Sequence, residues 1–274
     1  MLKIPLSDTT FKNIRDYIYE KSGIYISDTK KYLIENRLSR LLQEKALNSF
    51  EEYFKLIKFN TNGNELTRLF DAVTTNETYF FRESHQITTL VDQVLPKMFG
   101  SNKFSKQLKF WSAACSTGEE PYTISMMLMD KMLTPNNFQI HASDISEGVL
   151  ASAKKAVYNS YSVRNIPDNC LEKYFTPAGQ NFNLNTKIKS TVNFSKINLI
   201  ENRNFKSIKG MDVIFCRNVL IYFDTKAKQK VVSNLYDSLN PGGYLIIGSS
   251  ESLHNITRAF RPTVINKVIL YQKI

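Results

Sequence analysis

The 274-residue sequence is poor in the residues that hold metal ions or form disulfides. Its only cysteines are far apart and form no C-x-x-C pair: Cys115, Cys170 and Cys216. Its histidines are isolated as well: His85, His141 and His254. We therefore expect no metal site and no disulfide, and this cysteine usage suits a reducing cytoplasm.

Long apolar runs are also missing. No stretch approaches the roughly 18 uninterrupted apolar residues of a membrane span, and the N-terminal segment lacks the apolar core of a signal peptide. We expect a cytoplasmic protein with no membrane insertion. The hydrophobic content of 42% still supports a substantial core, and the length suffices for one large domain or two smaller ones.

The charge is strongly positive, with a formal net charge of +11. Residues 1–75 hold 12 Lys/Arg against 10 Asp/Glu, whereas the rest holds 24 against 15. Such an excess attracts an acidic partner, with nucleic acid as the first candidate, anionic lipid the second and an acidic protein surface the third. No block of consecutive like charges indicates a disordered basic tail.

Residues 1–75 predict a small all-α domain. Apolar residues recur at helical spacing in four segments that begin near residues 8, 28, 49 and 64. In the second segment Arg37 and Arg40 are three residues apart and share a face. Composition alone favours a solvated surface there, and the alternative is a docking face for an acidic partner.

Strands and helices alternate from residue 108 onward, which predicts a mostly parallel sheet. We expect strands near 108–113, 138–143, 192–194, 211–216 and 244–248, then an antiparallel pair near 263–266 and 268–271. Residues 158–190 look irregular. The predicted fold is α/β: a doubly wound, seven-stranded, Rossmann-like domain over 108–274, preceded by the helical domain and by a linker and helix over 76–107.

The segment 108–122 predicts a buried strand, a turn of small residues and a helix start. Only Gly118 remains of a G-x-G-x-x-G pattern, and Glu119 and Glu120 would repel a diphosphate. The turn therefore suits a nucleoside without phosphates, which points to S-adenosylmethionine. The alternative is an ordinary strand–helix turn with a solvated glutamate pair.

Polar residues follow four successive predicted strands. Asp144 ends the second strand, where an acid can bind both ribose hydroxyls, although a helix cap is the alternative. Asn198 follows the third strand, and Arg217 and Asn218 follow the fourth. Because ligands of open α/β sheets bind beyond the carboxyl ends of the strands, these residues predict one ligand site.

Five segments resemble the chemotaxis receptor methyltransferases, the CheR family, and together they span nearly the whole chain. They are 76–82 (NETYFFR), 111–122 (WSAACSTGEEPY), 142–145 (ASDI), 215–224 (FCRNVLIYFD) and 242–252 (GGYLIIGSSES). The resemblance implies a protein-glutamate O-methyltransferase that uses S-adenosylmethionine and releases S-adenosylhomocysteine. Its substrate would be glutamates on the cytoplasmic helical bundle of chemoreceptors.

The resemblance also implies the residues of the site. Asn76, Thr78 and Arg82 would line it from the linker, and Glu119 or Glu120 would hold the adenosine together with Asp144. The pair Asn198 and Leu199 and the pair Arg217 and Asn218 would complete the pocket. Arg82 and Tyr222 would lie nearest the transferred methyl group.

By the same resemblance, the N-terminal domain presents a basic face to the receptor, with Arg37 and Arg40 as the candidates. Some family members insert a small β-subdomain before the third strand and use it to tether a receptor C-terminal pentapeptide. Residues 170–195 occupy that place, but the loop from Phe175 to Val192 is short and has one glycine, Gly179. We expect a monomer that does not use the tether.

Two other functions remain as alternatives. Nucleic-acid amino-methyltransferases usually carry an Asn/Asp-Pro-Pro-Tyr/Phe motif after the fourth strand, whereas residues 216–222 read CRNVLIY and contain no proline. We therefore expect no nucleic-acid partner. A non-catalytic binding module is the other alternative, and the presence of Arg82, Asp144 and Tyr222 argues against it.

Overall fold

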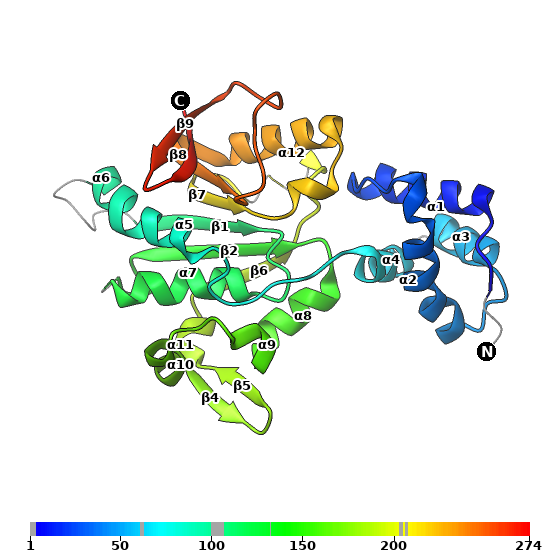
Figure 1. Ribbon diagram of the computed structural model, residues 1–274, viewed down its shortest axis with the longest axis horizontal. Coiled ribbons are helices and arrows are strands. Elements are labelled where there is room, and N and C mark those ends of the chain that lie inside the picture. The colour runs from blue at the N-terminus through cyan, green and yellow to red at the C-terminus, as the bar shows by residue number, and fades with distance from the viewer. Residues whose placement is uncertain (1–3, 61–62, 100–106, 132, 203–204, 206–207) are drawn as a thin grey trace.

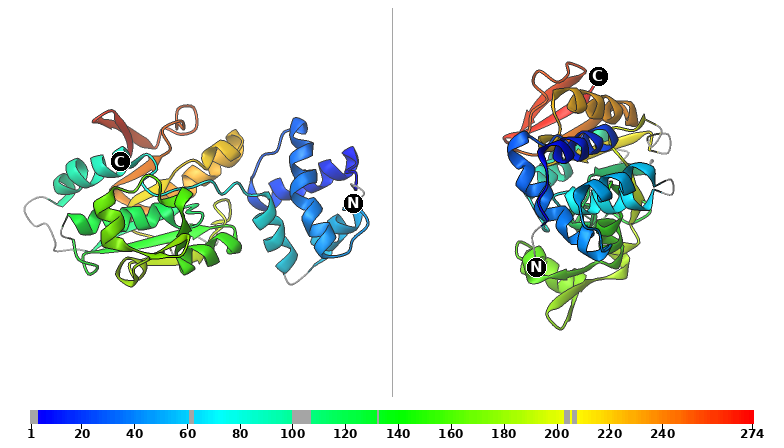
Figure 2. Two further views of the ribbon diagram at one scale, coloured as in Figure 1. Left: turned by 60° about the horizontal axis from the view of Figure 1, so that its bottom comes forward. Right: turned by 90° about the vertical axis from the view of Figure 1, so that its right-hand side faces the viewer.

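The computed structural model describes residues 4–60, 63–99, 107–131, 133–202, 205 and 208–274 (Figure 1). Among these residues, the first part is a lobe of four helices at one side of the molecule (Figure 2): α1 (Asp8–Ser22), α2 (Lys31–Glu44), α3 (Phe50–Phe59) and α4 (Asn64–Val73), with a 3₁₀ turn, η1 (Asp28–Lys30), before α2. Local signals set the helix ends: the Ser7 side chain accepts from the Thr10 amide, and Gly23 ends α1 at a φ of 73°.

A separate apolar core holds the helical lobe together. Its fully buried members include Ile14, Ile18, Leu38 and Tyr53, which come from three different helices. Ile14 and Ile18 are four residues apart and therefore share the inward face of α1. The helices are thus stabilised mainly by packing, because single helices of 10 to 15 residues are marginal in water.

The second part is built on a seven-stranded sheet in the order β6-β2-β1-β7-β8-β10-β9. The strands are β1 (Leu108–Ala113), β2 (Phe138–Asp144), β6 (Val192–Lys196), β7 (Met211–Cys216), β8 (Leu239–Ile247), β9 (Phe260–Ile265) and β10 (Val268–Lys273). The first five strands of this order are parallel, and β10 runs antiparallel to both of its neighbours. The predicted doubly wound, seven-stranded fold is confirmed.

Successive side chains of a strand point to opposite faces of the sheet and pack into two apolar layers. Phe110 belongs to the layer that contains α5 (Ser84–Thr89), the π turn η2 (Leu90–Val94) and α7 (Glu119–Asp130). The next residue, Trp111, belongs to the layer under α12 (Thr225–Ser238). Both side chains are fully buried. The same alternation in β7 explains why all six of its residues are buried.

The segment between β2 and β6 contains regular helices and strands, whereas its composition predicts an irregular stretch over residues 158–190; the family resemblance places a small β-subdomain at residues 170–195. After α8 (Glu147–Lys155) the segment forms a three-stranded antiparallel sheet, β3 (Val157–Asn159), β5 (Asn181–Leu184) and β4 (Phe175–Ala178), with the short helices α9 (Ser160–Val163), α10 (Asp168–Tyr174) and α11 (Thr186–Lys189). Tyr158, Phe175 and Leu184 anchor this small sheet in the main core. The residue pattern alone did not predict these strands, because each is only three or four residues long and the segment is polar.

The end of the sheet follows the prediction, with shifted boundaries. β8 starts at Leu239 rather than near residue 244, because an irregularity after Met211 brings the Pro-Gly-Gly segment into the strand. β9 and β10 pair through a two-residue turn in which Asn266 and Lys267 have φ values of 47° and 64°. Two left-handed residues match the twist of a tight hairpin.

Candidate active site

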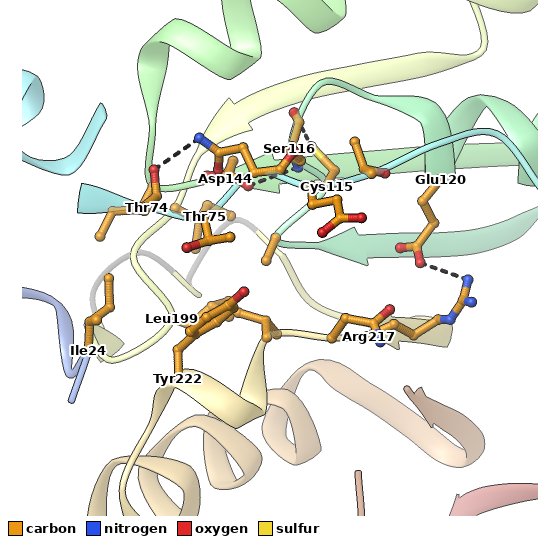
Figure 3. Close-up of a pocket in the computed structure, with 18 of the residues that line it drawn as sticks. Ile24, Thr74, Thr75, Cys115, Ser116, Glu120, Asp144, Leu199, Arg217 and Tyr222 are labelled. Atoms are coloured by element: carbon orange, nitrogen blue, oxygen red, sulfur yellow. Dashed lines mark hydrogen bonds and ion pairs between the residues drawn. The ribbon is translucent and has the colours of Figure 1, made fainter. Parts of the chain in front are cut away.

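A cavity lies where the helical lobe meets the carboxyl ends of β1, β2 and β7 (Figure 3). Separate segments line it: Thr74 and Thr75 follow α4, Asp144 ends β2, and Arg217 and Tyr222 follow β7. The lining brings together all but one of the predicted cofactor and catalytic residues: Asn76, Thr78, Arg82, Glu120, Asp144, Asn198, Leu199, Arg217, Asn218 and Tyr222. None of the three histidines lines it.

The turn between β1 and α7 has an unusual backbone. Ala114, Ser116 and Gly118 all have positive φ, at 60°, 49° and 93°. At Gly118 a Cβ atom would lie 3.0 Å from the side chain of Ala153, so glycine serves both the conformation and the close packing there. Left-handed non-glycine residues cost energy and concentrate at functional sites. This turn wraps around the carboxylate of the next strand.

Asp144 is the buried acid of the cavity, with 6% of its surface exposed. Its carboxylate accepts from the Ser116 amide at 2.9 Å and from the Ser146 amide at 3.0 Å. Burial raises the pKa of Asp144 above its usual value, although these backbone donors oppose the shift. The two donors hold the carboxylate in one orientation and leave lone pairs for hydroxyl donors in the cavity.

The two adjacent glutamates at the start of α7 point to different places. Glu120 lines the cavity and accepts from the Ser112 hydroxyl at 2.6 Å and from Arg217 Nη1 at 3.0 Å. Glu119 does not line the cavity: it is almost fully buried and accepts from the Thr117 and Ser162 hydroxyls. Burial raises the pKa of Glu119. Of the pair, only Glu120 is placed to contact a ligand.

Arg217, directly after β7, is held on three sides. Besides Glu120, its guanidinium donates to the Arg82 carbonyl at 2.7 Å and to Glu83 at 3.2 Å. Partial burial opposes ionisation of Glu83, but Arg217 and the Ser249 donors hold the pKa of this carboxyl below its usual value. Arg217 Nε is buried and has no hydrogen-bond partner among the described residues.

Asn218 is placed by a carboxylate that our sequence analysis missed. Glu251, after β8, accepts from the backbone amides of Asn218 at 2.9 Å, Ile221 at 3.2 Å and Gly248 at 2.7 Å. The three donors span the segment that carries Tyr222. Asn218 has a φ of 56°, so its backbone amide faces this acceptor rather than continuing the strand. Glu251 lies in segment 242–252, one of the five that resemble the CheR family, but only the structure shows its contacts.

The helical lobe supplies the opposite wall of the cavity. The Tyr25 amide donates to the Tyr222 carbonyl at 2.8 Å, and Ile24 forms an isolated β-bridge with Phe223. Asn198 donates from its side chain to the Lys21 carbonyl at 2.6 Å. The end of α1 therefore fixes the segments that follow β6 and β7.

A second contact from the lobe reaches the buried acid indirectly. Asp71 in α4 accepts from the Ser146 hydroxyl at 2.6 Å and from the Gly148 amide at 3.2 Å. The Ser146 amide in turn donates to Asp144. Sequence analysis missed Asp71 because it reads as an ordinary polar residue of an amphipathic helix.

Arg82 and Tyr222 line the cavity but make few contacts of their own. Arg82 Nη1 donates to the Glu77 carbonyl at 2.8 Å, and Arg82 has no ion pair within the described part of the chain. Tyr222 is partly exposed, and no described residue hydrogen-bonds its hydroxyl group. Both side chains are thus available to a ligand.

The two arginines of the predicted docking face differ. Arg37 donates to the Val73 carbonyl and, at 2.9 Å, to the Thr75 hydroxyl, so it fastens α2 to the linker. Arg40 has 85% of its side chain exposed and pairs with Glu44 one turn away. The structure therefore leaves Arg40 as the more accessible of the two.

Comparison with known proteins identifies the family. The model described as "CheR methyltransferase, all-alpha domain" matches residues 9–74, and "CheR methyltransferase, SAM binding domain" matches residues 76–269. The chain belongs to the CheR methyltransferase family. Chemotaxis protein methyltransferase 2 of Vibrio cholerae is 38% identical to it over 276 residues, covering 100% of this chain and 96% of that protein.

Two further relatives match at similar coverage. The chemotaxis protein methyltransferase of Borreliella burgdorferi is 37% identical and covers 92% of this CheR-family chain and 91% of its own length. Chemotaxis protein methyltransferase Cher2 of Pseudomonas putida is 33% identical, with 96% and 97% coverage. Among the described helices, none has the length and apolar character needed to cross a membrane.

The cavity suits S-adenosylmethionine, the cofactor of this family. Asp144 offers an oriented acid for a ribose diol, and the turn after β1 carries two glutamates instead of a phosphate-binding loop. Glu120, which lines the cavity with its carboxylate held by Ser112 and Arg217, suits the ammonium group of the methionyl part. The described residues include no cluster of three or more potential metal ligands.

Proposed function

We propose that this CheR-family chain transfers the methyl group of S-adenosylmethionine to glutamate side chains of chemoreceptor cytoplasmic helices. The observation that carries the proposal is the pairing of family membership with the placement of Arg82 and Tyr222. Both line the cavity and have side-chain groups with no described polar partner beyond the single Glu77 contact. A cation and a phenol at the cavity suit an anionic acceptor.

The chemistry asks little of the protein beyond orientation. A glutamate with a pKa near 4.3 is already ionised at pH 7, so its carboxylate oxygen can attack without a general base. When bound, the cofactor supplies an electrophilic methyl group on a sulfonium. Arg82 would hold the acceptor carboxylate in line, and Tyr222 would position it and shield the reacting atoms from water. The absence of histidine from the lining is consistent with this scheme.

The decisive experiment uses tritiated-methyl S-adenosylmethionine with chemoreceptor-containing membranes and, in parallel, total RNA. Label on a membrane protein that mild base releases would establish glutamyl methyl esters. Arg82→Ala and Tyr222→Phe should reduce this label while S-adenosylhomocysteine binding stays measurable. Base-stable label in RNA would contradict the proposal, and cofactor binding without any label would favour a non-catalytic binding module.

We further propose that receptor docking involves Arg40 and does not require a pentapeptide tether. The β4–β5 hairpin turns through Gly179 and Gln180 alone, which supports the expectation of a short, tether-independent subdomain. Titration with a receptor C-terminal pentapeptide should give no measurable heat. A measurable affinity would contradict this part of the proposal.

A further inference from the structure

An exposed arginine beside the cavity is held rigid by two aromatic rings. The guanidinium carbon of Arg164, which follows α9, lies 3.8 Å from the ring centroid of Tyr79 and 3.7 Å from that of Tyr161. Two rings this close have to occupy opposite faces of the guanidinium plane. We call these three residues the Tyr–Arg–Tyr stack. It joins the linker, through Tyr79, to the small β-subdomain.

The stack borders the cavity. Tyr79, Glu77 and Arg82 all line the cavity. The guanidinium carbon of Arg82 lies 5.8 Å from the same Tyr79 ring. The Arg82 and Arg164 guanidinium carbons are therefore no farther apart than the sum of 3.8 and 5.8 Å.

The stack leaves the edge of the Arg164 guanidinium accessible. One N–H group donates to the Tyr161 carbonyl, and no carboxylate of the described chain forms an ion pair with Arg164. Glu77, the acid facing the stack, is engaged by the Tyr161 hydroxyl at 3.2 Å. Stacking uses the faces of a guanidinium, whereas carboxylates bind in plane at its edge. Because the rings already restrict the side chain, binding there loses less conformational entropy than at a mobile arginine.

We propose that Arg164 forms a second carboxylate subsite, which binds an acidic side chain of the substrate helix next to the glutamate held at Arg82. This inference rests on the proposed function. Side chains one or two turns apart on a helix are separated by about 5 to 11 Å along its axis, and the upper limit on the separation of the two guanidinium carbons lies within this range. Arg164 is thus a specificity-determining residue that selects acidic helices and does not contact the reacting atoms.

The test is steady-state methylation of chemoreceptor cytoplasmic fragments by the full chain. Arg164→Ala should raise KM for the fragment about 10-fold, as expected for loss of one charge-assisted contact, with little change in kcat and an unchanged Kd for S-adenosylhomocysteine. Arg164→Lys keeps the charge but loses the planar fork, so its KM should lie between the KM values of the wild type and of Arg164→Ala. Arg261→Ala, an exposed arginine on β9, is the matched control and should behave like wild type.

A receptor variant separates specificity from structural damage. Replacing the acids one and two turns from each methylated glutamate by glutamine should raise KM for the wild-type enzyme about 10-fold but leave KM for Arg164→Ala nearly unchanged. Equal sensitivity of both enzymes to this replacement would overturn the subsite, as would a normal KM for Arg164→Ala or its loss of cofactor binding. Failure of the wild type to methylate the unmodified fragment would instead contradict the proposed function, and the inference with it.

Discussion

The cavity has two walls that are built differently. The sheet wall, formed by residues at the ends of β1, β2 and β7, is fixed by parallel ladders and by buried polar partners such as those of Asp144 and Arg217. The helical wall, formed by the end of α1, by α4 and by the linker, is attached through a few polar contacts. Examples are the 2.6 Å bonds from Asn198 to the Lys21 carbonyl and from Ser146 to Asp71.

This difference indicates that the two walls contribute unequally to holding the groups of the cavity in place. Groups on the sheet wall are restrained by the fold itself, so removing one should cost much affinity or stability. Contacts of the helical wall restrain the same groups from outside, so their loss should produce graded effects. The site is thus shared by both parts of the chain rather than contained in the sheet domain. Changes on either wall measure how unequal the two contributions are.

The largest effect is expected at Asp144 on the sheet wall. Asp144→Asn should weaken S-adenosylhomocysteine binding about 100-fold, because an amide cannot accept from two backbone donors and two ribose hydroxyls at once. Isothermal titration calorimetry measures this change. Glu119→Gln is the matched control: it alters the buried acid at the first position of α7, which does not line the cavity, so the Kd of this variant should stay within about threefold of wild type. Equal losses would contradict our placement of the two acids.

The next effect concerns stability at the carboxyl end of β8. Glu251→Ala leaves three backbone amides without their acceptor and should lower the free energy of unfolding by about 2 to 3 kcal/mol. Urea denaturation followed by circular dichroism measures it. Glu147→Ala, which removes a partly exposed pair with Lys196, should change stability by no more than about 0.5 kcal/mol. A similar loss in both variants would show that Glu251 has no special positioning role.

A smaller effect is expected from the helical wall. Asp71→Ala should weaken S-adenosylhomocysteine binding about 5-fold, because Ser146 loses the acceptor that holds it beside Asp144. Asp71→Asn keeps an acceptor oxygen and should restore most of the affinity. If Asp71→Ala binds as tightly as wild type in the same calorimetric titration, the helical wall does not contribute through this contact.

The smallest effect near neutral pH comes from titration of Asp144. Burial raises its folded pKa, so the carboxylate that accepts hydroxyl donors is fully present above that pKa and is lost as the pH falls through it. S-adenosylhomocysteine affinity should therefore begin to fall at a higher pH than an ordinary aspartate would give. Titrations from pH 7 to pH 4 should show this decline in the wild type, and Asp144→Asn should lack it.

The sheet wall was largely predictable from the sequence and the helical wall was not. Strand periodicity located β1, β2 and β7, and the rule for strand ends selected Asp144 and Arg217 before any geometry was known. Nothing local distinguishes Asp71 or Lys21, because their contacts join segments that are 75 or more residues apart. The choice between Glu119 and Glu120 also required the structure, since both occupy the first turn of one helix.

The small sheet shows a second limit of sequence reading. Its strands are too short and polar for alternation to stand out, and they are ordered by a few residues such as Tyr158 and Phe175 that insert into the main core. The Tyr–Arg–Tyr stack depends on the same long-range packing. Neither Tyr79 nor Arg164 carries a local signal that predicts their contact.

The most direct test of a site shared by both walls is a double-mutant cycle between Asp71 and Asp144, read as Kd for S-adenosylhomocysteine. If Asp71 acts through Ser146 on Asp144, then Asp71→Ala should weaken binding in the wild-type background but have almost no further effect in Asp144→Asn. The coupling energy would then equal nearly the whole Asp71→Ala effect, about 1 kcal/mol for a 5-fold change. Fully additive losses would contradict the account, because they would mean that the helical wall and the buried acid contribute independently.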